Sequence, residues 1–139
     1  MYTRAALLGG VDGVITSFAI VAGTDAGSLS RTTVLVIGLS SLFADGLSMG
    51  VSEYISSSSE QNVRGGEARP SLLGFVCFLS FVVCGLVPIV TFLWSASLLS
   101  CASFSLVELM LLGAGRTRYT QEPLLYGLLQ TSVLGGAAG

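Results

Sequence analysis

The sequence predicts an all-α integral membrane protein, a single domain over residues 1–139 built as a bundle of about five transmembrane helices. Hydrophobic residues make up 52% of the chain and charged residues 10%, and the mean hydropathy is +0.82. A water-exposed surface needs more charge than this, so we expect lipid around most of the chain. The run from Pro70 to Val107 has no charged residue. As one helix it would be roughly 57 Å long against a hydrocarbon core of about 30 Å, which predicts two spans and a tight turn.

Hydropathy and the clusters of polar, glycine and proline residues divide the chain into five expected spans. They lie at about residues 5–24, 33–56, 71–93, 96–115 and 123–139. The segment SSSSEQNVRGGEARP between the second and third spans is rich in serine, glycine and charge. It is expected to be a flexible cytosolic loop over residues 57–70. The last span would be only about 25 Å long with no polar anchor after it, so we expect an incomplete fifth helix.

The arginines predict how the bundle is oriented. Arg4 precedes an apolar stretch, but Asp12 interrupts it and no cleavage pattern follows, which favours a retained first helix over a signal peptide. Every arginine except Arg31 falls on the N-terminal side of a five-span chain. Because positive residues favour the cytosolic side, the N-terminus is expected in the cytosol.

Several function classes are not expected. The net charge is −2, Lys and His are absent and the arginines are scattered, so there is no basic face for nucleic acid. No Walker A, GxSxG, HExxH or Rossmann pattern occurs, which argues against an enzyme. No cofactor is implied. Cys77, Cys84 and Cys101 lie in apolar runs without CxxC spacing, which indicates packing residues rather than a disulfide framework or a zinc site.

Carboxylates inside the spans are the informative residues, because each costs several kcal/mol in lipid and is usually kept for function. Asp12, Asp45, Glu53 and Glu108 qualify. On the second span Asp45, Met49 and Glu53 are spaced i, i+4 and i+8, which places them in one stripe on a helix face. Counted from the far side, Asp45 lies roughly 18 Å deep and Met49 roughly 24 Å, with Glu53 near the cytosolic boundary. All four acids are expected toward the cytosolic entrance.

This ligand set favours a transported metal ion. Carboxylates bind hard divalent cations, and a thioether adds softness that first-row transition ions tolerate, whereas copper and zinc more typically recruit His or Cys. Oxygen ligands with Met49 therefore indicate Fe²⁺ or Mn²⁺. The same carboxylates can exchange a bound cation for protons, which is a physical basis for antiport.

Each of these residues has a structural alternative. Asp45 can be a satisfied hydrogen-bond partner between helices, and Met49 can be core filler. Glu53 can sit among lipid headgroups, and Glu108 can pair with the arginines that follow it. Asp12 is harder to explain structurally, because the glycines of GGVDGV open the backbone around it.

A complete pathway is expected to need two copies of the chain, because the first two spans have no second copy in the sequence. Small-xxx-small spacing, which lets helices approach closely in lipid, recurs along the chain. The pairs are Gly9/Gly13, Gly23/Gly27 and Gly46/Gly50.

The motifs VDGVITSFAIVAGTDAG and LSSLFADGLSMGVSEYISSSSE resemble the first two helices of the vacuolar iron transporter family. The rest of the chain matches more loosely, through the third span with Pro88, LLGAGRTR and LLQTSVLGGAAG. The resemblance implies a five-helix protomer in a homodimer, with the ion path at the interface and Fe²⁺ moving from cytosol to vacuole in exchange for protons. Asp12, Asp45, Met49 and Glu53 occupy the matching motif positions. The family's helical cytosolic domain is replaced by SSSSEQNVRGGEARP, as in its short, nodulin-21-like members.

The leading hypothesis is a homodimeric Fe²⁺ and/or Mn²⁺ transporter with protons as counter-ion. Asp12 and Glu53 would attract ions at the cytosolic mouth, Asp45 and Met49 would form the site within the membrane, and Glu108 is a further candidate. Alternatives are a non-transporting membrane subunit and a proton or cation channel. The expected location is a vacuolar or other endomembrane, or the plasma membrane in a prokaryote.

Overall fold

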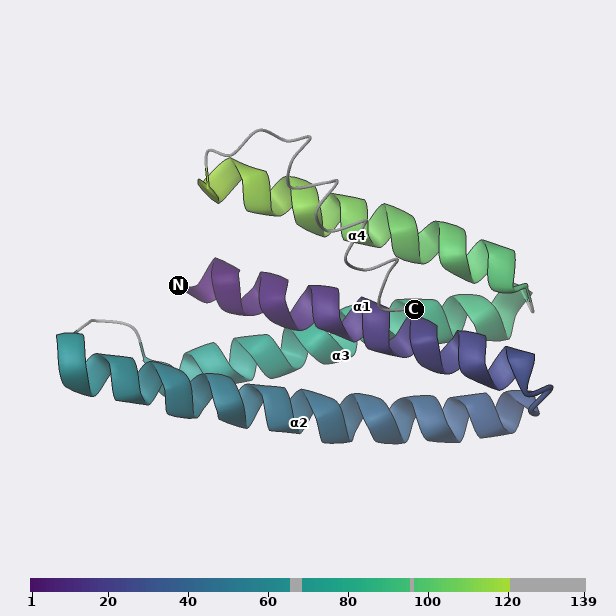
Figure 1. Ribbon diagram of the computed structural model, residues 1–139, viewed down its shortest axis with the longest axis horizontal. Coiled ribbons are helices and arrows are strands. Elements are labelled where there is room, and N and C mark those ends of the chain that lie inside the picture. Colours follow the sequence, from purple (N-terminus) through teal and green to yellow (C-terminus); the bar gives the residue numbers. More distant parts are fainter. Residues whose placement is uncertain (66–68, 96, 121–139) are drawn as a thin grey trace.

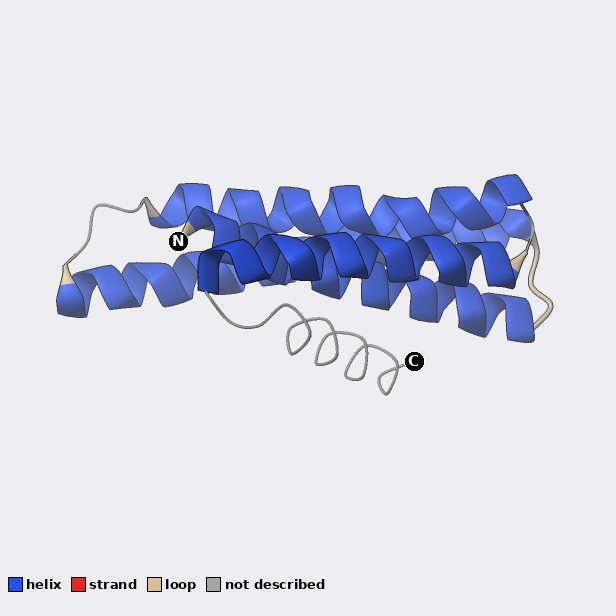
Figure 2. Ribbon diagram, turned by 90° about the horizontal axis from the view of Figure 1, so that it is seen from above, coloured by secondary structure: helices blue, strands red, loops and turns tan. Residues whose placement is uncertain are grey.

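The computed structural model describes residues 1–65, 69–95 and 97–120, and this part of the chain is helical. Its helices are α1 (Tyr2–Ala26), α2 (Arg31–Arg64), α3 (Pro70–Ser95) and α4 (Leu98–Thr120). All four are long and apolar enough to cross a membrane. They run side by side in alternating directions, as Figures 1 and 2 show. The predicted all-α membrane bundle is confirmed, and each of the first four predicted spans falls on one of these helices. The expected fifth span, 123–139, lies outside the described residues.

Helix α3 is the centre of the bundle. It contacts α1, α2 and α4, and its contact with α1 is the most extensive of any pair. In Figure 1, α4 and α2 lie on opposite sides of α1 and α3. The two faces of the protomer therefore belong to different helices, with α2 on one face and α4 on the other.

Glycines bring the backbones of the helices together. Gly9 and Gly13 of α1 are buried, and a Cβ at either position would press on the backbone carbonyl of Cys77 or Phe81 in α3. A Cβ at Gly50 of α2 would lie 2.9 Å from the carbonyl oxygen of Gly74 in α3. Two of the three predicted glycine pairs thus lie at helix contacts, as close packing in lipid requires.

The third glycine pair lies elsewhere. Nothing is within 4 Å of a Cβ built at Gly23. Gly27 follows the end of α1, and its N–H donates to the carbonyl of Gly23 at 3.1 Å. This pair belongs to the end of α1 rather than to a helix crossing.

The apolar core lies between α1, α2 and α3. Phe81, Leu42 and Ile89 are fully buried together with Val14 and Val21 of α1. Cys77 and Cys101 are buried too, and all three cysteines are free thiols, as expected for packing residues. Pro88 is accommodated within α3, and the Cys101 thiol donates to its carbonyl oxygen at 3.3 Å.

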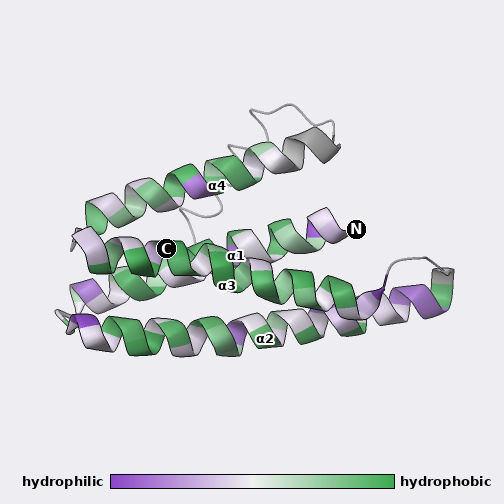
Figure 3. Cartoon of the chain, turned by 180° about the vertical axis from the view of Figure 1, so that it is seen from behind, coloured by the Kyte–Doolittle hydropathy of each residue, from purple (hydrophilic) through white to green (hydrophobic). Residues whose placement is uncertain are grey.

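The loop predicted over residues 57–70 is wrong for its first half, because α2 continues to Arg64. No glycine or proline occurs between Gly50 and Gly65 to end the helix. The serines satisfy their hydroxyls within the helix, with Ser57 bonding to the carbonyl of Glu53 and Ser59 to that of Ile55. Figure 3 shows this end of α2 as a hydrophilic extension of an otherwise mostly apolar helix. The helix ends at Gly65, whose φ of 69° suits glycine.

Candidate functional site

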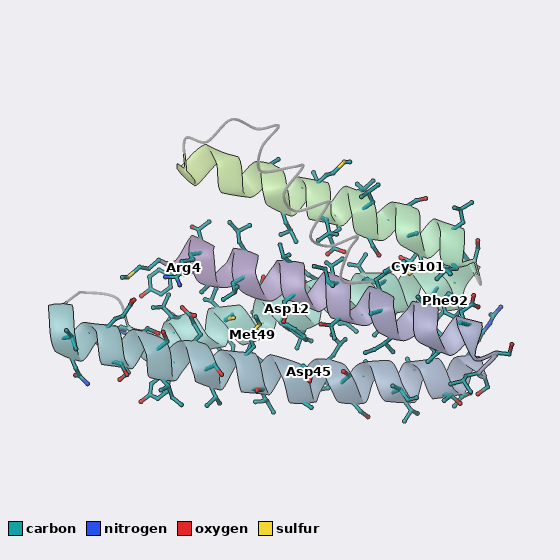
Figure 4. All side chains as sticks on the ribbon, viewed as in Figure 1. Arg4, Asp12, Asp45, Met49, Phe92 and Cys101 are labelled. Carbon is teal, nitrogen blue, oxygen red and sulfur yellow. The ribbon has the colours of Figure 1, made fainter. Side chains whose placement is uncertain are left out.

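Asp12 and Asp45 are brought to the same depth by the α1–α2 hairpin. The number of residues from Asp12 to the end of α1 equals the number from the start of α2 to Asp45. In antiparallel helices each acid is therefore about 21 Å from the connecting turn. Their carboxylates lie within electrostatic range of each other, and Figure 4 places Asp12 opposite the part of α2 that carries Asp45 and Met49. Two negative charges thus face the same region of the bundle.

Both acids are exposed on the surface of the single chain. The Ser41 hydroxyl donates to the Asp45 carboxylate at 2.6 Å, from one turn earlier on α2. Such a charge-assisted bond is short and strong, and it orients the carboxylate without covering it. Ser48 and Ser52 continue this exposed polar stripe along α2. An exposed stripe of acids and hydroxyls would face hydrocarbon in an isolated protomer, at a cost of several kcal/mol.

Met49 points inward from the same helix. It is half-buried and packs against both apolar clusters, one containing Leu42 and Phe81 and the other containing Leu73 and Cys77. Its thioether therefore lies between the exposed acids and the core, where packing holds it.

Glu53 is half-buried, one turn beyond Met49. Its charge and that of Asp12 both act on the thiol of Cys77 in α3. Asp12 and Glu53 thus both lie within electrostatic range of Cys77, on the side of α3 that packs against α1 and α2. Cys77 was predicted from the sequence as a packing residue only. Nothing in its apolar surroundings distinguished it from the other two cysteines, so its position beside these acids could not be predicted.

Glu108 is separated from the other acids. It is on α4, which packs against α1 and α3, and it interacts with the thiol of Cys84 on α3. One of its carboxylate oxygens, Oε2, is buried with no hydrogen-bond partner in the part of the chain that the structure describes. The arginines suggested as its partners, Arg116 and Arg118, have side chains outside the described part of the chain. The position of Glu108 along its span predicts a residue within the membrane. It does not predict on which side of the protomer the residue lies.

The described residues of one protomer do not complete a metal site by themselves. Among residues 1–65, 69–95 and 97–120, no group of three or more His, Cys, Asp and Glu side chains could hold a metal ion. What the described residues offer is an exposed pair of carboxylates, an oriented hydroxyl and an adjacent thioether. This arrangement can attract a divalent cation and supply part of its coordination shell.

A sequence profile of the VIT family matches residues 3–71 and 63–139. The chain is 48% identical over 61 residues to a protein named vacuolar iron transporter from Toxoplasma gondii (strain ATCC 50861 / VEG), an alignment covering 44% of this chain and 20% of that protein. It is 42% identical over 59 residues to one of the same name from Plasmodium falciparum (isolate 3D7), covering 42% of this chain and 22% of the relative. The chain thus aligns with about a fifth of the length of these curated relatives.

Proposed function

The chain belongs to the VIT family, the family of vacuolar iron transporters, and on this premise we propose that it carries Fe²⁺ and/or Mn²⁺ across a membrane as a homodimer. The proposed direction is from the cytosol into a vacuole or similar organelle, with protons moving the opposite way. The relatives are named for iron transport. The long apolar helices support an integral membrane location.

The observation that carries the proposal is the exposed pair of Asp12 and Asp45 at matched depth. Two carboxylates facing hydrocarbon would be costly, and a second copy covering this face removes that cost. The second copy also brings its own Asp12, Asp45 and Met49 to the same region. Two sets of ligands suffice for the roughly six-coordinate shell that hard divalent ions prefer.

The ligand chemistry supports the choice of ion. The carboxylates provide hard oxygen ligands, and Met49 provides a thioether whose position is held by the core clusters. Fe²⁺ and Mn²⁺ accept such a mixed set, while Mg²⁺ and Ca²⁺ gain nothing from sulfur. Carboxylates bind either a cation or a proton, which is a physical basis for moving the two in opposite directions.

The test is uptake of Fe²⁺ and Mn²⁺ into liposomes that contain the purified protein and an opposing proton gradient. We expect saturable uptake by the native chain, and its loss in Asp45→Asn and Met49→Leu. The matched control is Glu60→Gln, which removes an exposed acid from the polar end of α2 and should leave uptake unchanged. Folding and assembly of each variant are checked by size-exclusion chromatography with light scattering.

The other outcomes separate the alternatives. No uptake by well-folded native dimers would favour a non-transporting subunit. Flux that neither saturates nor depends on the proton gradient would indicate a channel. A protein that remains monomeric in lipid nanodiscs would contradict the shared site, since Asp12 and Asp45 would then have no covering partner.

A further inference from the structure

Glu108 forms a second polar site, inside the protomer. The stretch of α4 from its start to Glu108 is nearly as long as the stretch of α3 from Cys84 to its end. The α3–α4 hairpin therefore sets both side chains at nearly the same depth, about 15 to 17 Å from the turn. The Cys84 thiol lies within hydrogen-bonding reach of the Glu108 carboxylate. The carboxylate oxygen Oε2 is buried with no hydrogen-bond partner among the described residues.

The surroundings of this site are close-packed and contain few charges. On α1, Gly10 leaves room for Cys84, since a Cβ there would lie 3.2 Å from the thiol sulfur and 3.3 Å from the side chain of Leu112. On α3, the Ser80 hydroxyl is in hydrogen-bonding reach of the Cys84 thiol. Within the described residues, Cys84 is the titratable group that interacts with Glu108 from the packed helices α1 and α3. The charge of Asp12 acts instead on Asp45 and Cys77.

An ionised carboxylate in this position would be poorly compensated. Charge in the membrane interior is costly, and a thiol is only a weak hydrogen-bond donor. A bound proton removes the charge and supplies a donor at the carboxyl group. We infer that Glu108, with Cys84, is a proton-binding site inside each protomer, separate from the cation path, and the site from which the counter-ion proton is released.

The second half of this inference rests on the proposed function. The structure contains a physical link between the two sites: the Ser80 hydroxyl donates to the Ala6 carbonyl of α1 at 2.7 Å, and Asp12 lies less than two turns farther along that helix. We expect a change of protonation at Glu108 to act on Cys84 and Ser80, and through them on the helix that carries Asp12. Contact alone does not establish energetic coupling, so the coupling has to be measured.

The first experiment asks whether the proton is bound there at all. Infrared difference spectra of the full chain in lipid, recorded as the pH is changed, should contain a C=O stretching band from a protonated carboxyl. We expect this band to be lost in Glu108→Gln, shifted in Cys84→Ala and unchanged in Glu60→Gln. A spectrum of Glu108→Gln identical to that of the native protein would overturn the inference. This readout does not require transport, so it decides the proton site even if the native protein moves no metal.

The second experiment measures coupling in liposomes, with metal uptake and a pH-sensitive dye recorded together. Glu108→Gln should retain downhill metal uptake but lose metal-driven proton release, to the level of empty liposomes. Glu108→Asp, which keeps the carboxyl, should restore proton release. If Glu108→Gln still exchanges protons for metal, or if it folds but loses both fluxes together, Glu108 is not a separate proton site. Absence of metal uptake by the native protein contradicts the proposed function and with it the release of a counter-ion proton from Glu108.

Discussion

Replacing Gly9 with alanine tests whether the close approach of α1 and α3 sets the stability of the bundle. A Cβ at this position would press on the carbonyl oxygen of Cys77 and lie 3.1 Å from its carbonyl carbon and 3.2 Å from the backbone nitrogen of Phe81. All three are backbone atoms, so no side chain can rotate away and the helices must separate. Overpacking of this kind costs about 1–3 kcal/mol, while alanine in a helix returns up to about 1 kcal/mol relative to glycine.

The control for this prediction is Gly23→Ala on the same helix. A Cβ at Gly23 has nothing within 4 Å, so only the gain in helix propensity remains. In thermal unfolding followed by size-exclusion chromatography, Gly9→Ala should melt several degrees lower than the native protein, since about 4 °C corresponds to 1 kcal/mol for a chain of this size. Gly23→Ala should melt at or slightly above the native temperature. Equal melting of the two variants would refute the argument that backbone contact between α1 and α3 limits stability.

Two further predictions use matched pairs. Phe81 is fully buried whereas Leu99 is 78% exposed, so Phe81→Ala should lower the free energy of unfolding by about 3–5 kcal/mol. Leu99→Ala should change it little, and a similar loss in both variants would contradict the assigned core. The Ser41 hydroxyl donates to the carboxylate of Asp45, while the Ser52 hydroxyl donates to the backbone carbonyl of Ser48. Ser41→Ala should therefore weaken Mn²⁺ binding measured by calorimetry roughly tenfold, the lower end of the range for a bond to a charged group, and Ser52→Ala should leave it unchanged.

Much of the fold was predictable because hydropathy and helix length are strong signals in a membrane chain. They locate the spans, and depth follows from the rise per residue. What they do not give is the direction in which a side chain faces around its helix. Glu108 was placed with the other acids because only its depth could be estimated, and the structure puts it on the α4 side of the protomer. Cys77 and Cys84 sit in similar apolar runs, yet one lies beside Asp12 and Glu53 and the other beside Glu108.

The end of α2 shows a different limit. A run of serines is typical of linkers, and composition alone favoured a loop after residue 56. Each serine can also bond to the carbonyl one turn earlier, and with no glycine or proline before Gly65 the helix continues. The loop and the helix differ in the hydrogen-bond acceptor of the serine hydroxyls, which in the helix is the backbone carbonyl one turn earlier. The motif named Asp12 and Asp45 directly, and the α1–α2 hairpin sets these two residues at the same distance from the connecting turn.

The central position of α3 has a consequence for the synthesis of this protein in the cell. Helices leave the ribosome in chain order, so α1 and α2 enter the membrane before the helix on which both pack has been made. Until α3 is inserted, Gly9, Gly13 and Gly50 have no α3 backbone to pack against. The α1–α2 hairpin alone therefore lacks the helix that its glycines contact, and we expect a chain that stops after Arg64 to be less stable in the membrane than the full chain, which a comparison of their half-lives would measure.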